Sequence, residues 1–186
     1  MDLMEALRGR RAVRGYSAEG VSRATVADLI EAAIWAPSAM NEQPWAFVVV
    51  EGDARLTGFS DRAKRVVLDS LTADSPLARY REHLEDAAFQ IFYHAPVLVV
   101  VCATQAVSQA EEDCCLAAQN LMLEAHARGL GTCWIGFARA WLNRPEIKAE
   151  LGIPAAWSAV APLVIGHAKA APAPTSRNAA TVIWSA

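Results

Sequence analysis

Hydrophobic residues recur along the chain with two different spacings, which predict a mixture of helices and strands. Apolar positions three or four apart are typical of helices that bury one face. This spacing predicts helices over segments 3–9, 23–36, 53–71, 74–95, 110–128 and 143–151. Uninterrupted apolar runs leave no face for water and predict buried strands, over segments 47–50, 97–102, 131–137 and 159–165.

The chain ends in a further strand-like run, ATVIW, which follows a proline-rich stretch without a helical period. An apolar strand on a stiff arm needs the edge of a sheet, and a partner chain would offer one. Folding back onto the chain's own sheet is the alternative. Because no repeat, linker or boundary interrupts the pattern, residues 1–186 are expected to form a single domain, the protomer of an assembly.

Composition adds to this picture, since 54% of the residues are hydrophobic and only 20% are charged. Either the core is large or apolar surface is buried against a second chain, and we favour the second. The net charge of −3 without a basic stripe argues against nucleic-acid binding. No window is apolar enough for a membrane span, and the N-terminus does not resemble a signal peptide.

Cysteine and histidine positions exclude further classes of site. The four cysteines form no C-x-x-C pair and are expected to be small buried side chains in a reducing cytoplasm. The four histidines are scattered without the spacing of metal ligands, so no metal site is expected.

Arginines cluster in the segment RGRRAVRGY, at positions 8, 10, 11 and 14 of an otherwise slightly acidic chain. Like charges repel, so such a cluster is costly unless it is solvated or faces an anion. Guanidinium groups match phosphate oxygens in a bidentate geometry. Residue type alone favours a solvated face over a phosphate site.

Two amides stand between two indoles in the segment WAPSAMNEQPW, where a helix gives way to a buried strand. Asn41 and Gln43 each offer donors and an acceptor, which suits the edge of a heterocycle. Trp35 and Trp45 could flank a flat ligand, although a core role is the commoner one for tryptophan.

Glycines flank the predicted strand in GLGTCWIGF, where backbone N–H groups could approach a ligand closely. A helix C-cap accounts for Gly129 but less well for Gly136. The chain has no G-x-G-x-x-G, Walker or G-x-S-x-G pattern, so neither a classical nucleotide fold nor a serine nucleophile is predicted. Without a catalytic side chain, the pattern suits a cofactor that supplies its own chemistry.

Taken together, these residues resemble the nitroreductase family of flavin enzymes. Four segments carry the likeness, in the order of the family's motifs: RRAVRGY, APSAMNEQPWAFVVV, NLMLEAHARGLGTCWIG and LVIGHAKAAPAPTSR. The resemblance implies an α+β fold with a mixed central sheet flanked by helices. It also implies a homodimer that holds FMN at its interface, with the sheet completed by the partner's C-terminal strand.

The resemblance also implies roles for individual residues. Arg10, Arg11 and Arg14 would hold the FMN phosphate and ribityl chain and approach the pyrimidine end, while Arg177, helped by Lys169, would add positive charge at the phosphate. Three residues of the other protomer would line the flavin: Pro37, Ser38 and Ala39. The strand end would lie along the ring with a backbone N–H towards N5, through Trp134, Ile135 and Gly136.

The amide-bearing loop takes its role from the same likeness. Asn41 would hydrogen-bond the polar edge of the flavin ring, with Gln43 nearby. Ala12 departs from the family, which usually has Ser or Thr there, and the lost hydroxyl contact should cost on the order of 1 kcal/mol of FMN binding. Because no long insertion is present to form a lid, we expect an open, shallow substrate pocket.

The activity implied is hydride transfer from NADH or NADPH through flavin N5 to a small acceptor, by a ping-pong mechanism. Nitroaromatics, quinones and enones are candidate acceptors, and no side chain is assigned a catalytic role. Two alternatives stay open. One is a flavoenzyme of the same fold with another reaction, such as dehalogenation, flavin cleavage or azoline oxidation. The other is a non-catalytic flavin-binding dimer.

Overall fold

One antiparallel sheet lies at the centre of the computed structural model, which describes residues 1–72 and 74–185. Its strands are β1 (Trp45–Glu51), β2 (Val97–Ala103), β3 (Gly131–Trp134) and β4 (Ser158–Gly166), in the order β1-β2-β4-β3. Each neighbouring pair runs antiparallel. All seven residues of β2 are buried, as expected for a continuous apolar run covered on both faces.

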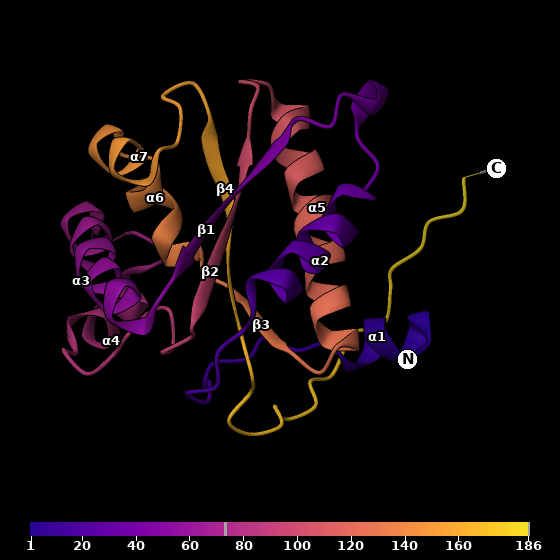
Figure 1. Ribbon diagram of the computed structural model, residues 1–186, viewed down its shortest axis with the longest axis horizontal. Helices are drawn as coiled ribbons and strands as arrows, with labels where there is room; N and C mark the ends of the chain where they lie inside the picture. Colours follow the sequence, from indigo (N-terminus) through magenta and orange to yellow (C-terminus); the bar gives the residue numbers. More distant parts are fainter. Residues whose placement is uncertain (73, 186) are drawn as a thin grey trace.

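Helices cover both faces of this sheet (Figure 1). Seven are α-helical: α1 (Leu3–Gly9), α2 (Arg23–Ile34), α3 (Asp53–Ser70), α4 (Arg81–Glu85), α5 (Ser108–Ala127), α6 (Arg139–Leu142) and α7 (Pro145–Leu151). Three short 3₁₀ turns complete the elements: η1 (Ala39–Asn41), η2 (Ala78–Tyr80) and η3 (Gly136–Ala138). The predicted α+β class is therefore confirmed.

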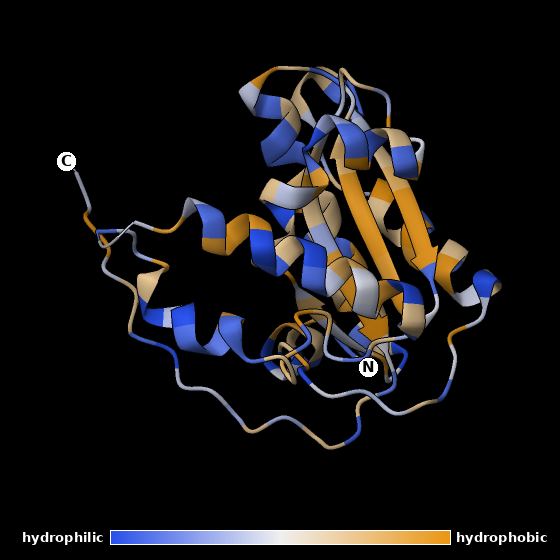
Figure 2. Cartoon of the chain, turned by 90° about the vertical axis from the view of Figure 1, so that its left-hand side faces the viewer, coloured by the Kyte–Doolittle hydropathy of each residue, from blue (hydrophilic) through white to orange (hydrophobic). Residues whose placement is uncertain are grey.

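Two hydrophobic cores form, one on each face of the sheet. Val97, Val99 and Val101 of β2 join the core that contains buried residues of α2 and α5. Leu98 and Val100 join the other core, with buried residues of α3, α6 and α7. Successive side chains of a strand point to opposite faces, so one apolar strand contributes to both cores. Figure 2 shows the apolar strands lying between helices that carry polar residues on their outer surfaces.

The N-terminal segment lies along the free edge of β3. Ala12 makes a parallel bridge to Thr132, and the Val13 N–H donates to the Thr132 carbonyl at 2.9 Å. This isolated bridge is parallel, but the four strands of the sheet are all antiparallel, so the prediction of a mixed sheet is wrong for the strands themselves. A Cβ on Gly131 would lie 2.7–2.9 Å from the Val13 side chain, so glycine is what permits this close approach. The other outer strand, β1, has no such cover among the described residues.

The helix predicted over 74–95 is wrong for most of its length, because only η2 and α4 form there. Instead, two side chains of α3 form hydrogen bonds with backbone groups of this segment. The Lys64 ammonium donates to the carbonyls of Asp86 and Phe89 at 3.0 and 2.8 Å. The Ser60 Oγ accepts from the Ile91 N–H at 3.0 Å. These contacts replace the helical ladder and fold the segment into turns.

The C-terminal arm does not follow the fold-back alternative. Residues 169–185 contain no strand or helix and are all exposed. Figures 1 and 2 show the arm running away from the body of the molecule. The run ATVIW therefore does not fold back onto its own sheet, and its pairing with a partner stays a prediction. Across the described residues, every helix is too short or too polar to cross a membrane.

Candidate functional site

A cavity of about 450 Å³, the arginine pocket, opens where the N-terminal segment meets the C-terminal arm. The segment after α1 contributes four lining residues: Arg10, Arg11, Ala12 and Arg14. The arm contributes the others: Pro172, Ala173, Thr175 and Arg177. The structure thus brings together four arginines from two ends of the chain that the sequence separates by more than 160 positions.

The positive charge of this pocket has no internal partner. Burial, together with the neighbouring charges of Arg11 and Arg177, lowers the pKa of Arg10. Within the part of the chain that the structure describes, none of the four pocket arginines forms an ion pair. The Arg11 Nε is buried without a hydrogen-bond partner. Unpaired buried donors are costly, so the pocket would favour an anionic ligand.

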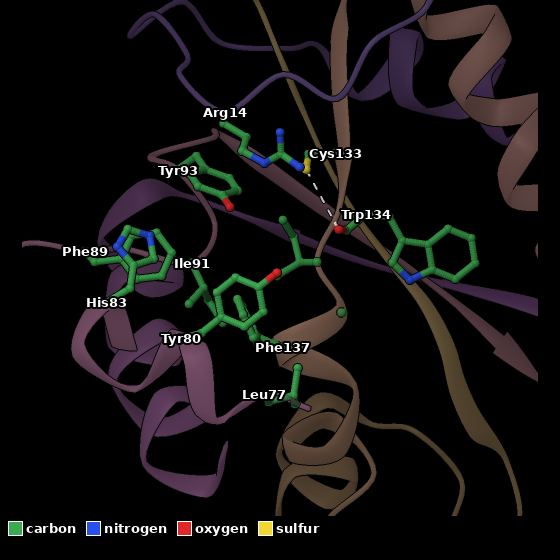
Figure 3. A pocket seen from close by; sticks show the side chains of 12 residues that line it. Arg14, Leu77, Tyr80, His83, Phe89, Ile91, Tyr93, Cys133, Trp134 and Phe137 are labelled. Atoms are coloured by element: carbon green, nitrogen blue, oxygen red, sulfur yellow. Dashed lines mark hydrogen bonds between the residues drawn. The ribbon is translucent and has the colours of Figure 1, made fainter. Parts of the chain in front are cut away.

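A second cavity of about 600 Å³, the aromatic cavity, is drawn in Figure 3, and Arg14 lines both this cavity and the arginine pocket. One side is formed by β3 and η3, through Cys133, Trp134, Ile135, Gly136 and Phe137. The opposite side comes from the segment between α3 and β2, through Leu77, Tyr80, His83, Phe89, Ile91 and Tyr93. Together the two cavities form a site with a cationic part and a flat, largely apolar part.

The wall of the aromatic cavity is a structure that sequence reasoning missed. Tyr80 packs edge-on against Phe137 with ring centroids 5.7 Å apart, and His83 lies 3.7 Å from Phe89 between centroids. This wall comes from the short elements η2 and α4 and the turns after them. The expected open, shallow pocket is therefore walled on one side without any long insertion.

Burial also changes the acidity of groups that line the aromatic cavity. The pKa of the Tyr93 hydroxyl is raised by burial, as is that of the Cys133 thiol. Both groups stay neutral near pH 7, because each has an ordinary pKa above that value already. The cavity therefore offers neutral donors beside the single guanidinium of Arg14.

The end of β3 contributes backbone groups to the aromatic cavity more than it contributes side chains. Figure 3 shows the Trp134 indole pointing away from the aromatic wall, while the Cys133 Sγ donates to the Trp134 carbonyl at 3.8 Å. The Ile135 N–H donates to the Pro162 carbonyl at 2.8 Å and is thus occupied within the sheet. A Cβ built on Gly136 would meet no atom within 4 Å. Glycine therefore keeps space open in the cavity at this point.

The amide loop, residues 38–43, lies elsewhere in the chain. It stands beside the start of α5, whereas the arginine pocket lies near the other end of that helix (Figure 1). Twenty residues of α5 span roughly 30 Å. The predicted flavin contacts of Pro37, Ser38, Ala39, Asn41 and Gln43 would therefore have to be made with a flavin held by the other protomer, and they stay predictions.

The backbone of the amide loop is strained at three residues that are not glycine. Met40, Asn41 and Gln43 have φ values of 52°, 57° and 49°. The left-handed region costs roughly 1–2 kcal/mol for a residue with a Cβ, although Asn tolerates it better than most. Strain of this kind persists where surrounding contacts fix it, and it clusters at ligand-binding sites.

Hydrogen bonds close the amide loop on itself. The Ser38 Oγ accepts from the Gln43 N–H at 3.0 Å, and the Gln43 Nε2 donates to the Asn41 Oδ1 at 3.2 Å. The two amides that the sequence singled out thus orient each other. Lys169, by contrast, is exposed and lines neither cavity; its backbone N–H donates to the Gly15 carbonyl at 3.0 Å.

The chain is similar to known proteins over most of its length. The model described as "Nitroreductase family" matches residues 7–167. A protein of Methanothermobacter thermautotrophicus, to which NADH dehydrogenase or NAD(P)H nitroreductase activity is provisionally assigned, is 31% identical over 140 residues. Those residues are 73% of this chain and 61% of that protein, so the chain spans less than two thirds of this relative's length.

Two further likenesses cover more of both chains. The 5,6-dimethylbenzimidazole synthase of Rhodospirillum rubrum is 32% identical over 175 residues, which are 84% of this chain and 77% of the synthase. The crystal structure of a nitroreductase with bound FMN from Bacteroides fragilis is 26% identical, with a TM-score of 0.84. It covers 100% of this chain and 99% of that one, and so includes the arm with Arg177.

Proposed function

The chain belongs to the nitroreductase family, and on that premise we propose that it is an FMN-dependent oxidoreductase. It would use NADH or NADPH to reduce a small acceptor such as a nitroaromatic, a quinone or an enone. The observation that carries the proposal is the continuity of the site: a pocket lined by four arginines shares Arg14 with a cavity lined by aromatic side chains.

The residues present fit FMN. Arg10, Arg11 and Arg177 would hold its phosphate, since guanidinium forks match phosphate oxygens and the Arg11 Nε is a buried donor without a partner. The open space at Gly136 suits a flat ring beside the strand end. When bound, FMN supplies the hydride-transfer chemistry, and the chain supplies binding and orientation.

Arg14 has a distinct place in this proposal because it lines both cavities. A cation beside the ring would favour negative charge on it and so raise its reduction potential. Since the Ile135 amide is occupied by Pro162, the backbone contact towards N5 would fall to Trp134 or Gly136. Donor and acceptor would then occupy the aromatic cavity in turn, which gives ping-pong kinetics.

The site requires a second copy of the chain. The amide loop and the arginine pocket lie at opposite ends of α5, so two chains that pack with their α5 helices antiparallel would bring each loop to the partner's pocket. Exposed apolar residues near α5 and α2 support such packing, since Trp35 is 80% exposed and Leu116 and Ile34 are 45% exposed. A homodimer would bury them.

The arm supports the same arrangement. Ile183 and Trp184 are 88% and 91% exposed, which is costly for apolar side chains in water. The uncovered outer strand β1 offers a sheet edge for a partner's residues 180–184, because β3 is already covered by the N-terminal segment. The four cysteines are unpaired, which suits the cytoplasmic location that we propose.

A second candidate keeps the flavin and changes the reaction. It is favoured by the 32% identity to a relative named as a synthase rather than a reductase. The two candidates differ in whether NAD(P)H is consumed with an acceptor. A non-catalytic flavin-binding dimer would bind FMN and transfer electrons to no acceptor.

The experiment begins with the absorbance spectrum of purified protein reconstituted with FMN. We expect a yellow protein that bleaches with NADH or NADPH in the absence of oxygen and regains colour when a nitroaromatic or quinone is added. Folded protein that stays colourless after reconstitution contradicts the proposal. Bound flavin that NAD(P)H does not bleach favours the second candidate.

A further inference from the structure

Asp113 is a buried carboxylate on α5 whose hydrogen bonds lead to the amide loop. Asp113 is only 5% exposed. Both carboxylate oxygens accept from the Ala39 N–H, each at 3.2 Å. Within the part of the chain that is described, no cation lies at salt-bridge distance from it. Burying a carboxylate is costly unless it is paired or hydrogen-bonded, so the bond from the Ala39 N–H is what makes a carboxylate tolerable at this position.

The contact with Ala39 falls at the start of the strained stretch. Met40 and Asn41 follow directly with positive φ, and Met40 is 92% exposed, so burial of its side chain does not hold the loop in this conformation. Hydrogen bonds hold the loop instead. The Asp113 carboxylate accepts from the Ala39 N–H, and the Ser38 Oγ accepts from the Gln43 N–H. The first ties the loop to the rigid helix, and the second closes it.

We propose that Asp113 is a positioning residue that fixes the amide loop in the conformation in which Asn41 and Gln43 meet the flavin held by the partner chain. This inference rests on the proposed function. A carboxylate is a stronger acceptor for a backbone N–H than a neutral side chain, and a helix moves less than a loop. The loop therefore approaches the ligand with its strain already fixed, and binding does not have to order it.

The sequence contains the signal for this residue. Ala110, Asp113, Cys114 and Ala117 recur at helical spacing and are all buried, so an acidic residue stands on the apolar face of a helix. Such a residue needs a polar partner from a neighbouring segment. The amide loop is the segment that supplies it.

The test compares Asp113→Ala and Asp113→Asn with Glu112→Ala, which removes a neighbouring exposed carboxylate from the same helix. Hydrogen exchange of the peptide that covers residues 36–45, measured without flavin, reports on the loop itself. FMN affinity and the midpoint potential of the bound flavin report on its use. In Asp113→Ala we expect exchange to rise and the FMN Kd to increase by about tenfold, the equivalent of one hydrogen bond. Asp113→Asn, which keeps one acceptor oxygen, should have an exchange rate and an FMN Kd close to those of wild type. Glu112→Ala should change neither the exchange nor the Kd.

Three results would overturn the inference. Unchanged exchange in Asp113→Ala would show that the carboxylate does not hold the loop. Faster exchange with unchanged FMN affinity and potential would show that the loop does not meet the flavin. An Asp113→Asn variant that binds FMN as weakly as Asp113→Ala would show that the hydrogen bond to the Ala39 N–H is not what matters.

If Asp113→Ala does not fold, Ser38→Ala removes the hydrogen bond within the loop and must give the same faster exchange and weaker FMN binding. Wild-type protein that binds no FMN contradicts the proposed function instead, while its exchange data still test the anchoring.

Discussion

The arginine pocket and the amide loop are built in opposite ways. At the pocket the backbone has no left-handed residue between Arg10 and Arg14, and the described residues provide no ion-pair partner for the four arginines. At the loop the hydrogen bonds are made internally, and the backbone is strained at three residues. In the arginine pocket, an anion would relieve the repulsion among the arginines. In the amide loop, hydrogen bonds maintain the strained backbone.

This difference predicts how the two regions respond to a ligand. A phosphate in the arginine pocket offsets the repulsion among Arg10, Arg11 and Arg177, so binding there should stabilise the fold directly. The amide loop gains little stability from a ligand, because its conformation is already fixed; it contributes through geometry. Substitutions in the pocket should therefore change affinity most, and substitutions in the loop should change it less.

The largest effect is expected from Arg10→Ala. Removing a charge-assisted hydrogen bond costs about 1.5–3 kcal/mol, so the FMN Kd should rise by roughly 10- to 100-fold. Fluorescence titration of FMN measures it. Arg144→Ala is the matched control, since Arg144 is exposed, pairs only with Glu146 and lies in neither cavity. Equal affinities for the two variants would show that the phosphate does not bind in the arginine pocket.

Gly136→Val tests the flat part of the site without touching a charge. Its side chain would enter open space, so the melting temperature of the flavin-free protein should hardly change while FMN affinity falls by about tenfold, the equivalent of one lost contact of about 1.4 kcal/mol. Gly58→Ala is the control: Gly58 also has open space around its Cβ position but lies inside α3. There alanine should add about 0.5–1 kcal/mol of stability and leave FMN binding unchanged.

How far the sequence predicts this molecule depends on where the partners of a segment lie. The four buried strands form where they were predicted, because an apolar run such as β2 carries its own signal, although the third ends at Trp134 and η3 replaces the rest of the predicted 131–137. The helix predicted over 74–95 does not form over most of its length, because the groups that unwind it, Lys64 and Ser60, stand on α3 more than twenty positions away from the carbonyls and amides they bind. Local periodicity contains no trace of such partners.

The site divides in the same way. Residue types singled out the N-terminal arginines and the two amides, and the family resemblance added Ala12 and Arg177 and the phosphate role; the structure brings Arg10, Arg11, Ala12, Arg14 and Arg177 to one pocket. The aromatic wall was missed because its residues lie in the turns that replaced the predicted helix. The positive φ values of the amide loop were not predicted, since they fall on Met40, Asn41 and Gln43 rather than on glycine, the residue that usually marks this conformation.

Asn41→Gly separates the amide of the loop from its backbone. Asn41 has a φ of 57°, so alanine would add strain to the loss of the amide, whereas glycine adopts this region freely. One hydrogen bond is worth about 1 kcal/mol, and Asn41→Gly should therefore weaken FMN binding by roughly fivefold. Asn41→Ala should be weaker still. A glycine variant that binds as tightly as wild type would leave the amide without a role in binding.

Ala12→Ser is expected to have the smallest effect, and in the opposite direction. Ala12 lines the arginine pocket, and its backbone is held beside Thr132 by the bridge to β3, so a hydroxyl added there would face the region assigned to the phosphate without moving the chain. A single new hydrogen bond of about 0.5–1 kcal/mol should tighten FMN binding by roughly two- to fivefold. Ala12→Val, similar in shape but without the hydroxyl, controls for added volume. The serine variant should bind FMN more tightly than both wild type and the valine variant, and equal affinity of serine and valine would place the phosphate farther along the pocket, towards Arg177.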